Sequence, residues 1–536
     1  MTDYSALERE YDHEALGHTK PQIIVRDELV AVTDEALALL EAAPNNGLYV
    51  RGRLLVQVAR SESAERLPWL RRPEGGPVIV PVETDALLDG LDRVACWLRP
   101  RRGELVPARP PAWVARQVMA RLNWPFPLLA GVVETPTLRP DGTVLETAGY
   151  DASTGLLYLP NAEYEPVLAL SRAEVADCVQ DLLDPVCDFP FVGDSDRGAY
   201  VAAVLSLVAR YAIPGPVPAF PIVAPVPGAG KGLLARLIAL IGTGREPAIM
   251  TMPGDEIEFR KRLLVLAIAG TAVVLLDNVS GAIGSDQLAA ALTTTEFTDR
   301  LLGVSRLVTA PLTATWLLTG NNLRFGRTLG RRMVPIALDP RCEHPEDRTD
   351  FRYPDAVAYV KSQRPRLVLA ALALIRAHLL AKQPAHGGAR MGSFEGWDRW
   401  VRSAVVWAGL ADPAATDDPT KARGRVRAEA DEDLEAFDDL LRALEAAYGA
   451  KSFRVADVVS QAAGDPQLAA ALQVSASPTK GGAPNAKSIG LTFRNIRDRI
   501  IRGRLLSKVD RIGRAGTWWH VSAPDGGMRG EVPEGT

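Results

Sequence analysis

A short glycine-rich segment, Gly228-Ala229-Gly230-Lys231-Gly232, stands between an apolar run (FPIVAPV) and a segment of helical character (GLLARLIALI). A strand, a glycine-rich turn and a helix N-terminus present successive backbone N–H groups to a phosphate, while a lysine at this place reaches the β and γ oxygens. A surface loop with a solvated lysine is the alternative interpretation. The context predicts a nucleotide site formed by Pro227, Gly228, Ala229, Gly230, Lys231, Gly232 and Leu233.

The residue that follows the lysine departs from the usual form of this motif. A Ser or Thr normally stands there, and its hydroxyl binds Mg²⁺. Here the position is Gly232. Because Mg²⁺ commonly retains several waters, we expect a water to replace the missing ligand, with weaker nucleotide affinity or slower turnover as the consequence.

A second apolar run, TAVVLLDNVSG, places Asp277 forty-six positions after Lys231. A buried strand that ends in a carboxylate beside a phosphate loop predicts a ligand for Mg²⁺ or its waters. The next residue is Asn278, which can orient water but cannot accept its proton. Three nearby acids could substitute as the base, although a solvated helix start is the favoured interpretation for them: Asp255, Glu256 and Glu258.

A third run, ATWLLTGNN, ends in Asn321 and Asn322, either of which could hold the attacking water or the γ-phosphate. A plain turn is the alternative for such a pair. Arg331 and Arg332 follow, and an arginine supplied across a subunit interface stabilises the charge that develops in phosphoryl transfer. A surface salt-bridge pair is the alternative for the two arginines.

The order of these elements resembles the core of superfamily 3 helicases, the AAA+-related motors of phages, plasmids and mobile elements, including the helicase half of primase-helicases. GAGKG, VVLLDN, LLTGNN and the arginine pair carry the resemblance within residues 218–340, while Gly232 and Asn278 depart from it. The resemblance implies a hexameric ring with ATP and Mg²⁺ at subunit junctions. It also implies a hairpin between the second and third motifs that grips single-stranded DNA, with Arg300 and Arg306 as candidates, although structural salt bridges are equally compatible with them.

The elements that must position these residues indicate an α/β core with a mostly parallel sheet, because short apolar strands alternate with helical segments. A helix is expected from about Ser195 to Ala212. The predicted organisation is an α+β N-terminal region (1–165), a helical connector (166–217), the ATPase core (218–340), a helical lid (341–411), a polar linker (412–431) and a C-terminal domain (432–536).

The C-terminal pattern, helices followed by a ribbon, resembles a winged helix, which lays one helix in the DNA major groove. Leu491, Ile496 and Ile500 are expected as the buried stripe of the fourth helix, and at least one of Trp518 and Trp519 as core. Protein recruitment is the alternative role. The DNA-binding candidates, opposed in this segment only by Asp498 and Asp510, are Lys487, Arg494, Arg497, Arg499, Arg502, Arg504, Lys508, Arg511 and Arg514.

The whole-chain composition limits the remaining possibilities. The net charge of −4 hides the basic C-terminal segment, and the four cysteines are too widely separated for a zinc ribbon. The chain shows no apolar segment of membrane-spanning length, so a cytoplasmic location is expected. We expect a DNA helicase or translocase that acts on single-stranded and duplex DNA, with a separate primase as a possible partner. A nucleotide-switched initiator that does not unwind DNA is the alternative.

Overall fold

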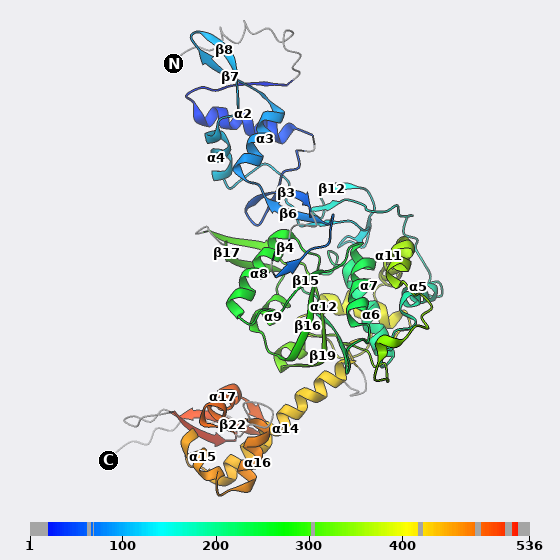
Figure 1. The fold of residues 1–536 in the computed structure, drawn as a ribbon, viewed down its shortest axis with the longest axis vertical. Coiled ribbons are helices and arrows are strands. Elements are labelled where there is room, and N and C mark those ends of the chain that lie inside the picture. Colours follow the sequence, from blue (N-terminus) through cyan, green and yellow to red (C-terminus); the bar gives the residue numbers. More distant parts are fainter. Residues whose placement is uncertain are drawn as a thin grey trace, which may run out of the picture. The chain divides into compact units, whose positions relative to one another are not determined.

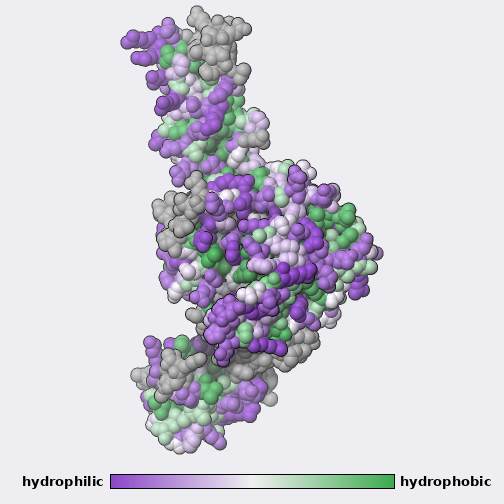
Figure 2. All heavy atoms as spheres, turned by 45° about the vertical axis from the view of Figure 1, so that its right-hand side comes forward, coloured by the Kyte–Doolittle hydropathy of each residue, from purple (hydrophilic) through white to green (hydrophobic). Residues whose placement is uncertain are grey.

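The computed structural model divides the chain into two compact units, Met1–Gly424 and Arg425–Thr536. The residues whose structure is described are 20–44, 46–61, 66–67, 69–301, 306–415, 422–476, 484–509 and 517–523. None of the helices within these ranges is long and apolar enough to cross a membrane. Hydrophilic side chains dominate the face of unit 1 that Figure 2 shows.

A seven-stranded sheet in the order β20-β14-β19-β16-β15-β5-β4 forms the centre of unit 1. Its first five strands are parallel, and their Val-, Ile- and Leu-rich runs are buried, as parallel strands covered on both faces require. This confirms the predicted α/β core. The strands are β14 (Phe220–Ala224), β15 (Ala248–Met250), β16 (Val273–Ile283), β19 (Thr315–Phe325) and β20 (Ile336–Ala337), followed at the edge by antiparallel β5 (Leu70–Arg71) and β4 (Arg66–Leu67).

Helices cover both faces of the sheet. Figure 1 shows α6 (Asp194–Val208), α7 (Lys231–Thr243) and α11 (Ala356–Leu380) on one side, and α8 (Glu256–Ala269) and α9 (Asp286–Ala291) on the other. Side chains alternate along β19 accordingly. Leu317 joins the core beneath α7, whereas the ring of Trp316 meets Phe259 of α8 edge-on at 6.3 Å.

Besides the strands β4 and β5, a buried arginine connects the N-terminal region to this core. Arg51, only 2% exposed, donates hydrogen bonds to the carbonyls of Leu129, Ala130, Ala267 and Pro311. The region's helices are α2 (Leu29–Ala42), α3 (Thr84–Val94) and α4 (Ala112–Ala120). Its small sheets are β1-β7-β8 (Gln22–Ile24, Cys96–Arg101, Glu104–Ala108), β2-β3-β6 (Tyr49–Arg51, Leu54–Arg60, Pro77–Pro81), β10-β11 (Thr137–Leu138, Val144–Leu145) and β12-β13-β9 (Gly149–Asp151, Leu156–Tyr158, Gly131–Val133).

The segment between the second and third motifs forms an antiparallel hairpin of β17 (Glu296–Arg300) and β18 (Leu307–Pro311). A turn of the N-terminal region lies against it. A Cβ atom on Gly52 would stand 2.1 Å from the carbonyl oxygen of Thr309, so only glycine permits this approach.

The rest of unit 1 is helical after the core. α11 packs against α5 (Val175–Leu183), α6 and α7, and the short α12 (Glu395–Trp397) and α13 (Ser403–Trp407) flank a π-helical turn, Asp398–Arg402. That these helices act as a lid stays a prediction.

Unit 2 packs helices against a three-stranded antiparallel sheet, β21 (Ile500–Ile501), β22 (Arg504–Val509) and β23 (Trp518–Ser522). Its helices are α14 (Ala422–Tyr448, which crosses the boundary between the units), α15 (Val455–Ala462), α16 (Pro466–Ser475) and α17 (Ala486–Ile496). Residues 412–431, expected as a linker, thus include the start of α14, because Ala, Arg and Glu favour a helix there.

The expected buried stripe of the fourth helix is correct only at Ile496. Leu491 is 54% exposed, and Ile500, 62% exposed, lies on β21 because α17 ends at Ile496. The buried face of α17 instead consists of Ile489, Thr492, Phe493 and Ile496. Trp519 is core, as expected for one of the two tryptophans, and its ring meets Phe493 edge-on at 5.4 Å.

Candidate functional site

The glycine-rich loop connects the end of β14 to the first turn of α7. Gly228 (φ +75°) and Gly230 (φ +87°) adopt left-handed backbone conformations that residues with a Cβ rarely reach. Lys231 opens α7, and its Nζ donates a hydrogen bond to the carbonyl of Val226 at 3.1 Å. Burial lowers the pKa of this lysine. The loop thus has the strand-turn-helix geometry that the motif predicts.

Gly232 lies in the first turn of α7 with open space where a side chain would begin. Among the described residues, no atom beyond the adjoining residues and the backbone of the same helix would lie within 4 Å of a Cβ at this residue. A Ser or Thr would therefore fit, and crowding does not explain the missing hydroxyl.

Asp277 lies on β16 beside Thr319 of β19. The Thr319 hydroxyl donates to Asp277 Oδ1 at 2.5 Å and accepts a hydrogen bond from the backbone N–H of Asn278 at 3.0 Å. Asn278 has a left-handed backbone (φ +51°), which asparagine tolerates better than most residues, and the register with β19 shifts there. Thr319 therefore fixes the carboxylate; sequence reasoning missed it, although it stands two residues before Asn321 on the same face of the strand.

Asn321 lies between the two preceding elements. It pairs in register with Ala224, the last residue of β14, and with Ser280 of β16. Among the described residues, its buried Oδ1 has no hydrogen-bond partner. Gly320 before it is required by packing, because a Cβ there would stand 2.3 Å from the Val279 carbonyl oxygen. The side chain of Asn322 lies outside the described part of the chain.

A cavity of about 250 Å³ adjoins the glycine loop. Its walls include the loop residues Gly228 to Gly230 and Leu233, the rings of Phe189, Phe351 and Tyr353, and Glu346. A nucleobase, which is flat and partly apolar, fits a cavity with such walls. The sequence analysis did not predict these cavity walls, although the clustered aromatic and proline residues of DFPF (188–191) and DFRYP (350–354) could have indicated an apolar binding surface.

Glu346 lies over the loop, since a Cβ on Gly228 would stand 2.7 Å from its Oε2. Its own backbone N–H and the His344 ring hold the pKa of this carboxyl below its ordinary value. A negative charge therefore faces the place where the motif expects phosphate.

The other acids near the core have structural roles. Asp255 caps α8, where its carboxylate accepts hydrogen bonds from the backbone N–H groups of Ile257 and Glu258. Glu256 Oε2 accepts from the N–H of Gln287. No group of three or more His, Cys, Asp or Glu side chains that could hold a metal occurs in the described ranges. A divalent ion at this site would depend on Asp277, water and phosphate oxygens, which suits Mg²⁺.

The two arginines follow the short α10 (Arg327–Gly330). Arg331 is exposed, whereas Arg332 is half-buried and donates to the carbonyl of Thr328. Burial, together with the neighbouring Arg331, lowers the pKa of Arg332. Exposure makes Arg331 the more accessible of the two to another subunit.

The two arginines of the β17-β18 hairpin that were predicted to contact DNA differ in their surroundings. Arg300 ends β17 and is exposed. Arg306 precedes β18, and its guanidinium donates to the carbonyl of Arg53 in the N-terminal region. The tip of the hairpin, 302–305, lies outside the described residues.

The basic residues of unit 2 divide into two groups. Arg504 forms ion pairs with Glu445 (2.7 Å) and with the fully buried Asp438 (3.2 Å) of α14, and Arg502 approaches Asp438 and Glu435. These arginines join the sheet to α14, so acids distant in sequence oppose the basic segment besides Asp498. Arg499 is half-buried, and Arg511, Arg514 and Asp510 lie outside the described residues.

The second group surrounds one hollow of about 350 Å³ whose walls include Lys487, Arg494, Arg497, Lys508 and Trp519. Lys487 and Arg494 come from α17, and Lys508 from β22. Four cations around one concave surface suit a phosphate backbone.

Comparisons with known proteins give limited likenesses. No protein-family model and no curated protein matches the chain. Among solved structures, the apo A form of the NrS-1 C-terminal region aligns at 12% identity over 79% of this chain and 93% of its own, with a TM-score of 0.33. An inhibitor-bound JCV helicase aligns at 15% identity over 39% of this chain and 62% of its own, with a TM-score of 0.20. Because these scores carry no argument about activity, we argue function from the chain's own geometry.

Proposed function

We propose that this chain binds and hydrolyses ATP at the loop around Lys231 and uses it to translocate on DNA as a ring-forming helicase. One observation carries the proposal: the glycine loop follows β14, the last residue of β14 is in register with Asn321 of β19, and Asp277 of the next parallel strand, β16, accepts a hydrogen bond from Thr319 of β19. Ligands of open α/β sheets bind at the carboxyl ends of such strands.

Each residue has a role that its position supports. Lys231 would exchange the Val226 carbonyl for phosphate oxygens, and the backbone N–H groups of the loop would hold the β-phosphate. Asp277, oriented by Thr319, would hold Mg²⁺, which neutralises charge on the phosphates. The unpartnered amide oxygen of Asn321 would accept a hydrogen bond from the attacking water.

Completion of the site requires a second copy of the chain. An arginine supplied in trans needs head-to-tail contacts, and these close into rings when the rotation permits. Arg331 is the better placed candidate because it is exposed. The resemblance to superfamily 3 helicases favours six copies, with the β17-β18 hairpin and its Arg300 turned toward DNA.

Unit 2 would bind duplex DNA as a winged helix, with α17 as the recognition helix and β22-β23 as the wing. The hollow of Lys487, Arg494, Arg497 and Lys508 would receive backbone phosphates. Arg502 and Arg504 would take no part, since they are paired with α14.

Steady-state ATP hydrolysis, with and without single-stranded DNA, tests the motor. The wild type should hydrolyse ATP and accelerate with DNA, and Lys231→Ala should be inactive. Lys261→Ala, which changes an exposed lysine on α8, should behave as the wild type. Equal activity in Lys231→Ala and wild type would contradict the proposal.

Duplex binding as a function of salt tests unit 2. Arg494→Ala should weaken binding and lower the slope of log K against log salt by about 1. The matched control Arg504→Ala should lower thermal stability, because it takes an ion-pair partner from the buried Asp438, while the salt slope stays unchanged. If Arg504→Ala lowered the salt slope and Arg494→Ala did not, the assignment of DNA contacts to the residues around the hollow would be wrong.

A nucleotide-switched initiator is the second candidate, favoured by Gly232 and by Asn278, which cannot act as a base. Nucleotide-dependent assembly on DNA with negligible turnover would support it. ATP-dependent unwinding of a forked duplex would exclude it.

A further inference from the structure

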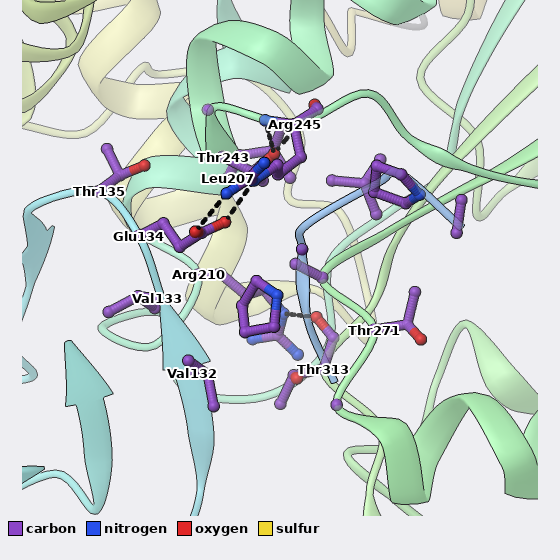
Figure 3. A pocket seen from close by; sticks show the side chains of 18 of the residues that line it. Val132, Val133, Glu134, Thr135, Leu207, Arg210, Thr243, Arg245, Thr271 and Thr313 are labelled. Atoms are coloured by element: carbon purple, nitrogen blue, oxygen red, sulfur yellow. Dashed lines mark hydrogen bonds and ion pairs between the residues drawn. The ribbon is translucent and has the colours of Figure 1, made fainter. Parts of the chain in front are cut away.

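A second cavity, of about 120 Å³, lies within unit 1 at the end of the sheet opposite the glycine loop. Its walls include Ala248 and Val273, the first residues of β15 and β16, together with Gly242 and Thr243 at the end of α7. Residues 132–137 of the N-terminal region close it (Figure 3). The space exceeds that of one water several-fold, so a molecule of several non-hydrogen atoms fits.

Arg210 supplies a buried positive charge in this wall. The residue is 7% exposed, and its guanidinium donates to the carbonyls of Thr313 (3.0 Å) and Gly215 (3.2 Å). Nη2 makes no hydrogen bond, and no carboxylate pairs with Arg210, among the residues that the structure describes. A buried guanidinium stays charged, so it favours an anion within reach.

Two hydroxyls of the same wall have no partner. Ser61, 3% exposed, and Thr313 each bury a side-chain oxygen that makes no hydrogen bond within the described ranges. Buried hydroxyls are nearly always hydrogen-bonded. Both can donate to an oxyanion.

The wall contains two acids, Glu134 and Glu246, and each is paired with arginine. Glu134 accepts hydrogen bonds from Arg245 on both carboxylate oxygens, each at 2.8 Å (Figure 3). It also accepts one from Arg60 at 2.8 Å, and Glu246 is paired with Arg236 at 2.6 Å. Two arginines for the Glu134 carboxylate leave this side of the cavity positive as well.

A hollow of about 380 Å³ adjoins the cavity and shares Arg72, Pro73, Arg245 and Glu246 with it. Arg71 and Lys361 add to its charge. Its two acids are Glu74 and Glu246, so the four cations outnumber them. An excess of cations around this hollow attracts anions to the neighbourhood of the cavity.

We propose that this cavity binds a small oxyanion, a phosphate or carboxylate group of a metabolite, through Arg210 Nη2 and the hydroxyls of Thr313 and Ser61. The site is separate from the nucleotide site, because the strands of the sheet lie between them. Nothing in the proposal depends on ATP hydrolysis.

Thermal unfolding of the full chain carrying Lys231→Ala tests the site, since this change weakens anion binding at the glycine loop. Sodium phosphate and sodium malonate are titrated against sodium chloride at equal ionic strength. A saturable rise in Tm with phosphate, malonate or both is expected, and their ratio shows which anion is preferred. No rise beyond that with chloride would overturn the proposal.

Substitutions in the cavity wall test whether the anion binds there. Thr313→Val and Ser61→Ala should each weaken the anion about fivefold, as loss of one hydrogen bond does. Without anion they should not lower Tm, because neither hydroxyl has a partner within the described part of the protein. Thr315→Val is the matched control, since its hydroxyl is also buried and unpartnered there but does not line the cavity. Equal anion binding in all three variants would refute the assignment.

Discussion

Replacement of Gly232 tests whether a hydroxyl beside Lys231 would change the use of Mg²⁺, separately from its effect on stability. A Cβ at this position has room, since no described atom beyond the adjoining residues and the backbone of its own helix lies within 4 Å of it. Serine would restore the magnesium ligand that the motif usually supplies. Alanine adds the same Cβ without the oxygen and is the matched control.

Gly232→Ser and Gly232→Ala should rank in one order for stability against unfolding and in the other order for affinity for Mg²⁺. Glycine disfavours a helix by about 1 kcal/mol relative to alanine and by about 0.5 kcal/mol relative to serine, so unfolding should be hardest for Gly232→Ala. A hydroxyl that replaces a water on Mg²⁺ should contribute about 1 kcal/mol, which is about fivefold in the Mg²⁺ concentration for half-maximal activity. Only Gly232→Ser should show that gain.

Thermal unfolding without nucleotide measures the first ranking, and ATP hydrolysis across a Mg²⁺ titration measures the second. If serine and alanine shift the Mg²⁺ midpoint equally, the hydroxyl does not reach the metal. The geometry assigned to the first turn of α7 would then be wrong.

Four further substitutions probe the proposed nucleotide site. Thr319→Val removes the donor to Asp277 and should lower Mg²⁺-dependent turnover about 10- to 100-fold; unchanged turnover would show that the carboxylate needs no support. Arg331→Ala or Arg332→Ala should lower hydrolysis about 10³-fold in steady-state assays while ATP still binds, and two fully active variants would remove both as fingers. Glu346→Gln should tighten binding of a fluorescent ATP analogue at low salt, because a like charge is removed, and the gain should shrink with added salt. Equal affinity at low salt would mean that Glu346 moves away when nucleotide binds.

The core of the site was predictable because its residues occupy the ends of apolar runs. FPIVAPV, AVVLLDN and ATWLLTG correspond to β14, β16 and β19, so the glycine loop follows β14 while Asp277 and Asn321 lie on parallel strands of the same sheet. Local periodicity and glycine placement contain this information.

Other features depend on contacts between distant segments. Glu346 approaches Gly228 from more than a hundred residues away, and Arg504 finds its partners on α14. The spacing of apolar residues also did not predict that α17 ends at Ile496. The backbone turns at Asp498 (φ +56°) into a strand, which moved Ile500 off the expected helix. Single-sequence patterns contain no distances of this kind.

The buried Arg51 limits how this protein could be recombined. All five of its N–H groups are engaged by carbonyls from the N-terminal region, from the end of α8 and from the last residue of β18. Residues 218–340 transplanted without the N-terminal region would lose that guanidinium and leave the Ala267 and Pro311 carbonyls without it. A chimaera that joins this core to another N-terminal region would therefore need a donor at the same place.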